Sequence, residues 1–158
     1  MKQIEFTMDK IFTFGSKDAE HRFIIRNHFL KNNSNFEGFK FQKDETFEVV
    51  IDIEHTKSSI DIDNVPKVII DAFSASQIKR DLENWHTYID KGDLSAAKQK
   101  EYENIVKLEE KHPLSAYKKL GLYQDDTIEY IGKLTCSAKV VKKDGPSVHV
   151  IIRATETL

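Results

Sequence analysis

The sequence contains a single cysteine, Cys136, among its 158 residues. One thiol excludes an internal disulfide framework and a zinc site built from several cysteines, and it is typical of proteins from a reducing compartment. No apolar run approaches the roughly 20 residues that a membrane-spanning helix requires. The first residues, MKQIEFTMDKIFTF, alternate apolar and polar side chains and lack the apolar centre of a signal peptide. We therefore expect a cytoplasmic protein that does not enter a membrane.

The chain also lacks an excess of charge of either sign. Its 24 Lys and Arg and 26 Asp and Glu give a formal net charge of −2, whereas a typical nucleic-acid-binding domain is strongly basic. This balance weakens the case for nucleic-acid binding, although a basic patch can coexist with an acidic site. With 39% hydrophobic and 32% charged residues, the composition is that of one soluble domain that folds without a disulfide or metal.

Strand and helix patterns alternate in the first half of the chain. Residues 1–8 and 46–55 alternate apolar and polar side chains, as half-buried strands do. Between them, residues 17–31 have helical spacing and residues 32–35 predict a turn. Residues 60–63 are expected to be extended. A helix should then begin at Asp63 or Asn64, which are both good N-cap residues.

Residues 74–121 have a different, helical character. Their patterns predict helices over 77–90 and 94–112, and a third short helix that ends at Gly121. Strands return at 130–143 and 148–156, with a turn between them.

The expected fold is therefore a single α+β domain over residues 1–158 with a mixed sheet. Its element order is β-α-β-α-β-β, and residues 74–121 form a helical insertion between the second helix and the third strand. We expect the insertion to project from the core as a helical hairpin that influences specificity.

Aspartates interrupt an apolar run at residues 58–73, SSIDIDNVPKVIIDAF. A carboxylate close to a core costs several kcal/mol unless something compensates it, so Asp61, Asp63 and Asp71 either face water or share a partner. In an extended segment Asp61 and Asp63 point the same way. Asp63, Lys67 and Asp71 are spaced to form one stripe of the following helix.

A second acidic pair, Asp125 and Asp126, precedes the third expected strand. If the two groups converge, carboxylates about 4 Å apart repel by roughly 4 kcal/mol at an effective dielectric near 20. Such an oxygen-only set suits Mg²⁺ or Mn²⁺, which stabilise charge on phosphates and activate water. Lys67 could neutralise negative charge that develops there.

A simpler interpretation needs no metal, and the spacing alone favours it. In this interpretation Asp63 or Asn64 caps a helix, Lys67 and Asp71 form a surface ion pair, and the second acidic pair lies in a turn.

The segment DIDNVPKVIIDAF resembles the central motif of the RusA-like Holliday junction resolvases, Asp-x-Asp-Asn-x-x-Lys-x-x-x-Asp-Ala-Leu. The segment YQDDTIEYI resembles the second motif of that family, and the resemblance covers roughly residues 1–73 and 120–156. It implies a homodimeric, Mg²⁺- or Mn²⁺-dependent endonuclease that hydrolyses phosphodiester bonds in branched DNA. Such enzymes act in DNA recombination and repair and are of a phage or prophage type.

The resemblance also assigns roles to individual residues. It gives catalytic roles to the residues that match the two motifs, Asp61, Asp63, Lys67 and Asp126. It gives metal binding to the four acids, Asp61, Asp63, Asp125 and Asp126. Lys67 would stabilise the phosphate in the transition state, and Asp71 is expected to support Lys67.

This chain departs from the family pattern in its insertion, in lacking a Pro-rich segment after the first strand, and in its low basic charge. These departures bear on specificity for four-way junctions more than on cleavage. The alternative from a different class is a non-catalytic module that binds nucleic acid or protein on the same fold.

Other residues give weaker signals. The six histidines show no metal-ligand spacing and are expected to be surface or hydrogen-bonded residues, and only His55 leads directly toward the acidic motif. Trp85, Tyr88 and Tyr102 could stack on bases, but a helical-hairpin core explains them better. Cys136 is expected to be a buried structural thiol.

Overall fold

A computed structural model describes residues 2–38, 45–56, 62–111, 117–142 and 146–155. The four strands of this part of the chain are β1 (Gln3–Met8), β2 (Thr46–His55), β3 (Ile131–Val140) and β4 (Ser147–Thr155). The α-helices are α1 (Asp18–Asn32), α2 (Val65–Ala72), α3 (Ala75–Glu83), α4 (Trp85–Asp90) and α5 (Ala96–Lys111). Two short 3₁₀ helices are η1 (Ile62–Asn64) and η2 (Lys118–Leu120). None of the described helices combines the length and the apolar character needed to cross a membrane.

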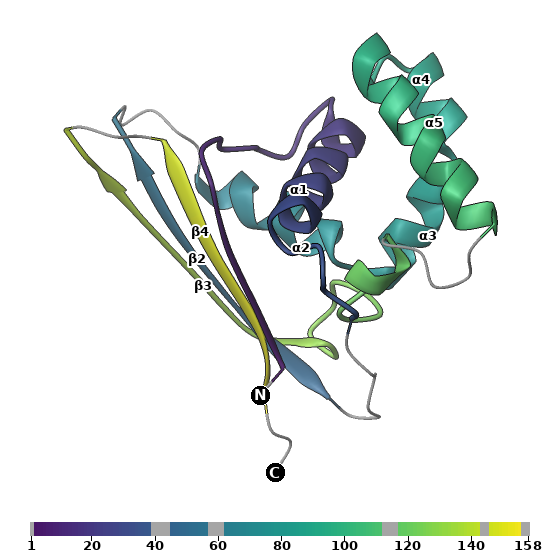
Figure 1. Ribbon diagram of the computed structural model, residues 1–158. Helices are drawn as coiled ribbons and strands as arrows, with labels where there is room; N and C mark the ends of the chain where they lie inside the picture. The colour runs from purple at the N-terminus through teal and green to yellow at the C-terminus, as the bar shows by residue number, and fades with distance from the viewer. Residues whose placement is uncertain (1, 39–44, 57–61, 112–116, 143–145, 156–158) are drawn as a thin grey trace.

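The strands form one mixed sheet in the order β1-β4-β2-β3, and the helices lie on one side of it (Figure 1). Strand β4 is antiparallel to both β1 and β2, whereas β3 runs parallel to β2. Parallel neighbours need a long crossover connection, and the helices from α2 to η2 supply it here. The expected α+β class with a mixed sheet is confirmed.

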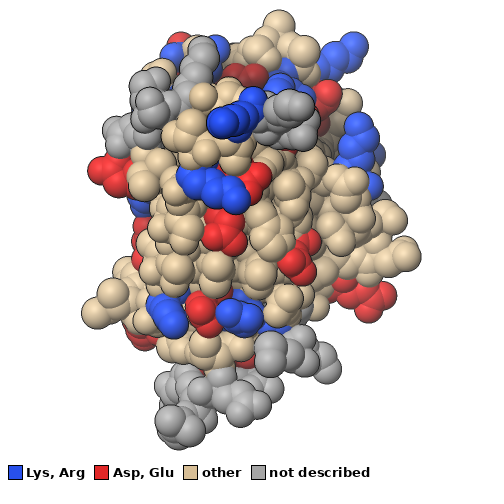
Figure 2. Space-filling view, turned by 90° about the vertical axis from the view of Figure 1, so that its left-hand side faces the viewer, with Lys and Arg blue, Asp and Glu red and all other residues tan. Residues whose placement is uncertain are grey.

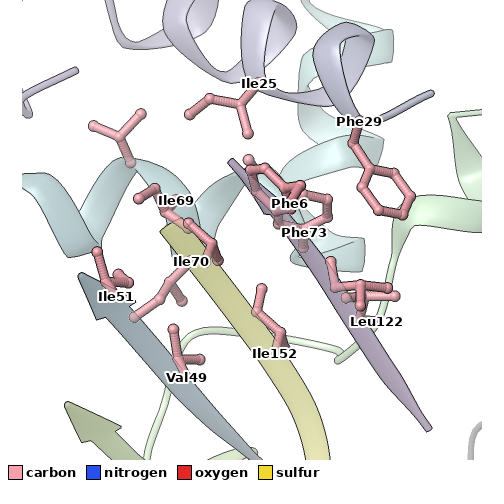
Figure 3. Packing of buried hydrophobic residues seen from close by; sticks show 14 of the residues in the cluster. Phe6, Ile25, Phe29, Val49, Ile51, Ile69, Ile70, Phe73, Leu122 and Ile152 are labelled. Carbon is pink, nitrogen blue, oxygen red and sulfur yellow. The ribbon is translucent and has the colours of Figure 1, made fainter. Parts of the chain in front are cut away.

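The main core lies between the sheet and helices α1 and α2. Apolar side chains alternate with exposed ones in β1, and the same period appears in β2 and β4. Helix α2 is buried along almost its whole length, because α1 covers one side of it and the sheet the other (Figure 3). Ile69, Ile70 and Phe73 belong to the same apolar cluster as Ile25 and Phe29 of α1, and the Phe73 ring lies edge-on to that of Phe29. Burial of each such side chain contributes about 1.5–3 kcal/mol.

The helical segment differs from the expectation in its details. The single helix predicted over residues 77–90 is two helices, α3 and α4, because the backbone leaves helical geometry at Asn84, where φ is −118°. The Asn84 side chain donates a hydrogen bond to the carbonyl of Arg80, which closes α3. The third predicted helix lies only partly within the described residues, and there it is the 3₁₀ helix η2. Pro113, which was expected to end the helix before it, lies outside the described residues.

The insertion packs against α1 through a second apolar cluster. Phe23 of α1 is fully buried there among Leu94, Tyr102, Val106 and Tyr117. Tyr102 is therefore a core residue, as the hairpin interpretation predicted, and it lies edge-on to Phe23 at a ring-centroid distance of 5.2 Å. Because α1 also covers the sheet, the same helix joins the insertion to the main core.

Within the described residues, no helix covers the other face of the sheet. Figure 2 shows this face, on which acidic and basic side chains are interspersed and basic ones do not gather into one patch. Several of its charges pair across strands, such as Arg153 with Glu48 at 3.1 Å. A face with this mixture has little attraction for a phosphate backbone.

Candidate acidic site

Two segments far apart in sequence meet at the end of α2. The backbone N–H of Leu122 donates to the carbonyl of Phe73 at 2.9 Å, and the N–H of Ala75 donates to the carbonyl of Tyr123 at 2.8 Å. Ser74 and Tyr123 form an isolated parallel β-bridge between them. This short bridge fixes the chain just before Asp125 and Asp126, and it directs the second acidic pair toward α2.

The side chain of Lys67 joins the two sequence motifs. Its Nζ lies 2.5 Å from Oδ2 of Asp126, which is 59 positions away in the sequence. The same Nζ lies 3.1 Å from the Asp71 carboxylate, one helical turn further along α2. The expected support of Lys67 by Asp71 is confirmed. The pair is not a simple surface pair, because Asp71 is only 7% exposed.

The electrostatics of this cluster follow from its uneven burial. Burial raises the pKa of Asp71, and the hydrogen bond and charge of Lys67 offset this only in part. The hydrogen bond from Lys67 lowers the pKa of Asp126, which is more exposed. Burial of the Lys67 ammonium opposes its charge, but the hydrogen bonds to Asp126 and Asp71 outweigh this and raise the pKa of Lys67.

The remaining predicted site residues are Asp63, Asp125 and Asp61. Asp63 lies in η1 with an exposed side chain, directly before α2. Asn64 occupies the N-cap position of α2, as predicted, but its side chain makes no capping hydrogen bond. The Asp125 carboxylate accepts a hydrogen bond from the N–H of Asp126 at 2.9 Å, which stabilises the turn. Asp61 lies outside the described residues.

The donor chemistry suits a hard divalent cation, but the described geometry is incomplete as a metal site. Asp63, Asp125 and Asp126 offer only oxygen ligands, which Mg²⁺ prefers. Among the residues with a described position, no three His, Cys, Asp or Glu side chains are grouped as metal ligands. A cation at Asp126 would also have to displace the Lys67 ammonium, which lies 2.5 Å from its Oδ2.

Two residues that the sequence analysis missed anchor α2. The Arg26 guanidinium of α1 is fully buried, and its Nε donates to the carbonyl of Ala72 at 2.6 Å. The Tyr123 hydroxyl, also buried, donates to the carbonyl of Ile70 at 2.6 Å. Both contact carbonyl groups in the last turn of α2, where helical carbonyls lose their intrahelical partners, and the Ile70 carbonyl also accepts the N–H of Phe73 at 3.3 Å. The available signal for Arg26 was a basic residue at helical spacing from Phe23, Phe29 and Leu30, and this spacing does not identify its partner.

Other candidates from the sequence lie elsewhere. His149 is on the open face of the sheet, where its Nε2 lies 2.7 Å from Oε1 of Glu5. His28 Nε2 lies 2.7 Å from the carbonyl of Thr7. Both fit the expectation of hydrogen-bonded histidines. Cys136 is half-buried on the edge strand β3, so the expectation of a fully buried thiol was wrong.

Comparison with known proteins adds no assignment. No protein-family model, curated protein or solved structure matches the chain significantly.

Proposed function

We propose that this chain is a Mg²⁺- or Mn²⁺-dependent endonuclease that hydrolyses phosphodiester bonds in branched DNA, as a homodimer of the RusA-like type. One observation carries the proposal: the lysine of the first motif contacts the aspartate of the second across 59 sequence positions. A chance pair of motif matches would have no reason to converge at one point of the fold.

In this proposal Asp126, Asp63 and Asp61 hold the cation, with Asp125 in support, and the cation supplies charge stabilisation and an activated water. Lys67 pairs with Asp126 in the absence of metal. When cation and DNA are bound, Lys67 neutralises charge on the phosphate. Asp71 keeps the ammonium within reach, because it contacts the same Nζ from the buried side of α2.

The variants Asp126→Asn and Asp63→Asn test the proposal. Each is nearly isosteric and removes one charge from the metal ligands, so cleavage of branched DNA with Mg²⁺ should fall by roughly two orders of magnitude or more. DNA binding in chelator should stay level or rise, because a charge that repels phosphate is gone. Asp126→Asn also loses its ion pair with Lys67, which is exposed enough to be worth no more than about 1 kcal/mol.

The matched control is Asp90→Asn, which removes an exposed acid at the end of α4. It should leave cleavage, binding and melting unchanged. If Asp126→Asn and Asp63→Asn cleave as the control does, the metal site is elsewhere and the proposal is wrong. If they lose folding together with cleavage, the aspartates are structural.

A second candidate function is a non-catalytic module that binds nucleic acid or protein. Two observations favour this module. The Lys67 ammonium forms an ion pair with Asp126, and the described side chains contain no group of three or more potential metal ligands. Calorimetric titration with Mg²⁺ and Mn²⁺, with and without branched DNA, separates the two. If the chain is an endonuclease, it should bind Mg²⁺ or Mn²⁺ at millimolar concentration, and Asp126→Asn should weaken that binding. If it is a non-catalytic module, no metal binding is expected.

A further inference from the structure

The outer edge of β3 is unusually long and open for the edge of a sheet. Strand β3 has ten residues and pairs with β2 on one side, and no strand in the described parts of the chain lies along its other side. From Gly132 onward its residues are exposed on both faces, apart from the half-buried Cys136. The N–H and C=O groups of such an edge can pair with another strand.

The other edge of the sheet, strand β1, is shorter and better covered than β3. Strand β1 has six residues, and its apolar side chains Ile4, Phe6 and Met8 are buried. An edge that is short and has its apolar residues covered offers little to a second chain.

An apolar stripe accompanies the open edge of β3. Leu134 and Val140 are 47% and 60% exposed, and Ala138 lies exposed between them on the same face. This is the helix-covered face of the sheet, because Leu134 pairs with the buried Val49 of β2. On the opposite face, Lys139 lies 3.3 Å from Glu54 of its own sheet, and Lys133 lies 4.0 Å from Glu48. Each of these lysines thus has an acidic partner on the neighbouring strand, although both remain largely exposed.

We propose that β3 pairs antiparallel with β3 of a second copy of this chain, about a twofold axis at Ser137. A twofold axis perpendicular to the sheet reverses the strand direction, so two identical edge strands related by it run antiparallel. If residue i of one copy then lies opposite residue j of the other, residue j of the first lies opposite residue i of the second. The two four-stranded sheets then join into one of eight strands, with the helices of both copies on the same side.

Side-chain chemistry selects the register. An axis at Ser137 sets Leu134 opposite the partner's Val140, so the two most exposed apolar side chains of the strand cover each other. It also sets Lys139 opposite the partner's Thr135. An axis one residue earlier, at Cys136, would set Lys133 directly opposite the partner's Lys139, and like charges in that position are destabilising.

The pairing rests on the proposed function, which already calls for a homodimer, and it names the strands that join the two copies.

Sedimentation of the wild-type chain over a wide concentration range, without metal or DNA, is the first test. It should show a monomer–dimer equilibrium. The variants Leu134→Lys and Val140→Lys change exposed side chains, so both should fold, and each should weaken the dimer by roughly tenfold or more because it enters the interface twice. The control Leu108→Lys replaces a side chain on α5 that is 55% exposed, and it should leave the dimer unchanged. A wild-type chain that stays monomeric, or a dimer that both lysine variants retain, overturns the proposal.

Single-cysteine variants test the register in a background of Cys136→Ser. Ser137→Cys places two thiols at the axis and should form a disulfide-linked dimer on mild oxidation. Thr135→Cys should not, because its copy lies four residues further along the paired strand, about 13 Å away. Cross-linking through the native Cys136 or through Thr135→Cys, with none through Ser137→Cys, overturns this register.

Discussion

Replacing Asp81 by asparagine should destabilise the fold more than any other single charge removal discussed here. Its carboxylate is 1% exposed. It accepts hydrogen bonds from Arg22 Nε at 2.8 Å and Nη2 at 2.7 Å, and from Arg26 Nη1 at 2.7 Å. Gln77 and Tyr88 donate to it as well, each at 2.8 Å. An asparagine would present an NH₂ group to neighbours that are all donors and would leave two guanidinium groups without a buried counter-charge.

The size of the effect can be estimated in two ways. Removing one partner of a buried, hydrogen-bonded charge pair typically costs about 3–5 kcal/mol. Burial opposes the charge of Asp81, but Arg26 and Arg22 outweigh it and lower its pKa from 3.8 to about 2. A shift of that size corresponds to roughly 2–3 kcal/mol. The second estimate is smaller because it compares carboxylate with carboxylic acid, which still offers an oxygen acceptor. We expect about 3 kcal/mol, or a melting temperature lower by ~6–12 °C for a domain of this size.

The pH dependence gives the prediction a second readout. Because the pKa of Asp81 is lower in the folded state, its contribution is fully present above pH 4 and is lost as pH falls from about 4 toward about 2. The difference in unfolding free energy between wild type and Asp81→Asn should therefore be largest near neutral pH and shrink over that acidic range.

Urea unfolding followed by circular dichroism at several pH values measures both effects, with Asp90→Asn as an exposed control in the neighbouring helix. Equal stability of Asp81→Asn and the control near neutral pH would refute the reasoning. So would a difference that stays constant down to about pH 2, because the lost contribution would then not be that of the Asp81 charge.

Two further predictions concern the insertion. Replacing residues 74–121 by a short Gly/Ser linker should unfold the protein, because it removes Asp81, the buried partner of Arg22 and Arg26. A deletion variant that folds with native-like circular dichroism would instead show that the insertion is a hairpin separable from the core. Glu109→Gln should keep or slightly raise the melting temperature, since burial raises the pKa of Glu109 and the amide oxygen can still accept from the N–H groups of Tyr117 and Lys118. Glu109→Ala should melt lower because it loses both bonds, and equal losses in the two variants would contradict this account.

The sequence by itself was sufficient for the elements whose pattern is local. Strands β1 and β2 could be predicted because alternation of apolar and polar residues reports a half-buried strand without reference to its neighbours. The start of α2 was predicted from the N-cap preference of Asp63 or Asn64, and the N-cap is Asn64. The ion pair of Lys67 with Asp71 was predicted because residues four apart share one helix face. The sequence likewise indicated that the insertion is helical and that Tyr102 lies in its core.

Only the tertiary structure decided which residues meet across long sequence distances. Asp81 lies in a polar helix and has the pattern of a solvent-exposed residue, and its burial depends on where α1 places Arg22 and Arg26. The contact between Lys67 and Asp126 depends on the backbone bridge at Ser74 and Tyr123, which no periodicity encodes. The alternation in β3 predicted a half-buried strand, yet the strand lies at an open edge. A side-chain period describes how one strand could be buried, but strand order is set by the connections and packing of the whole chain.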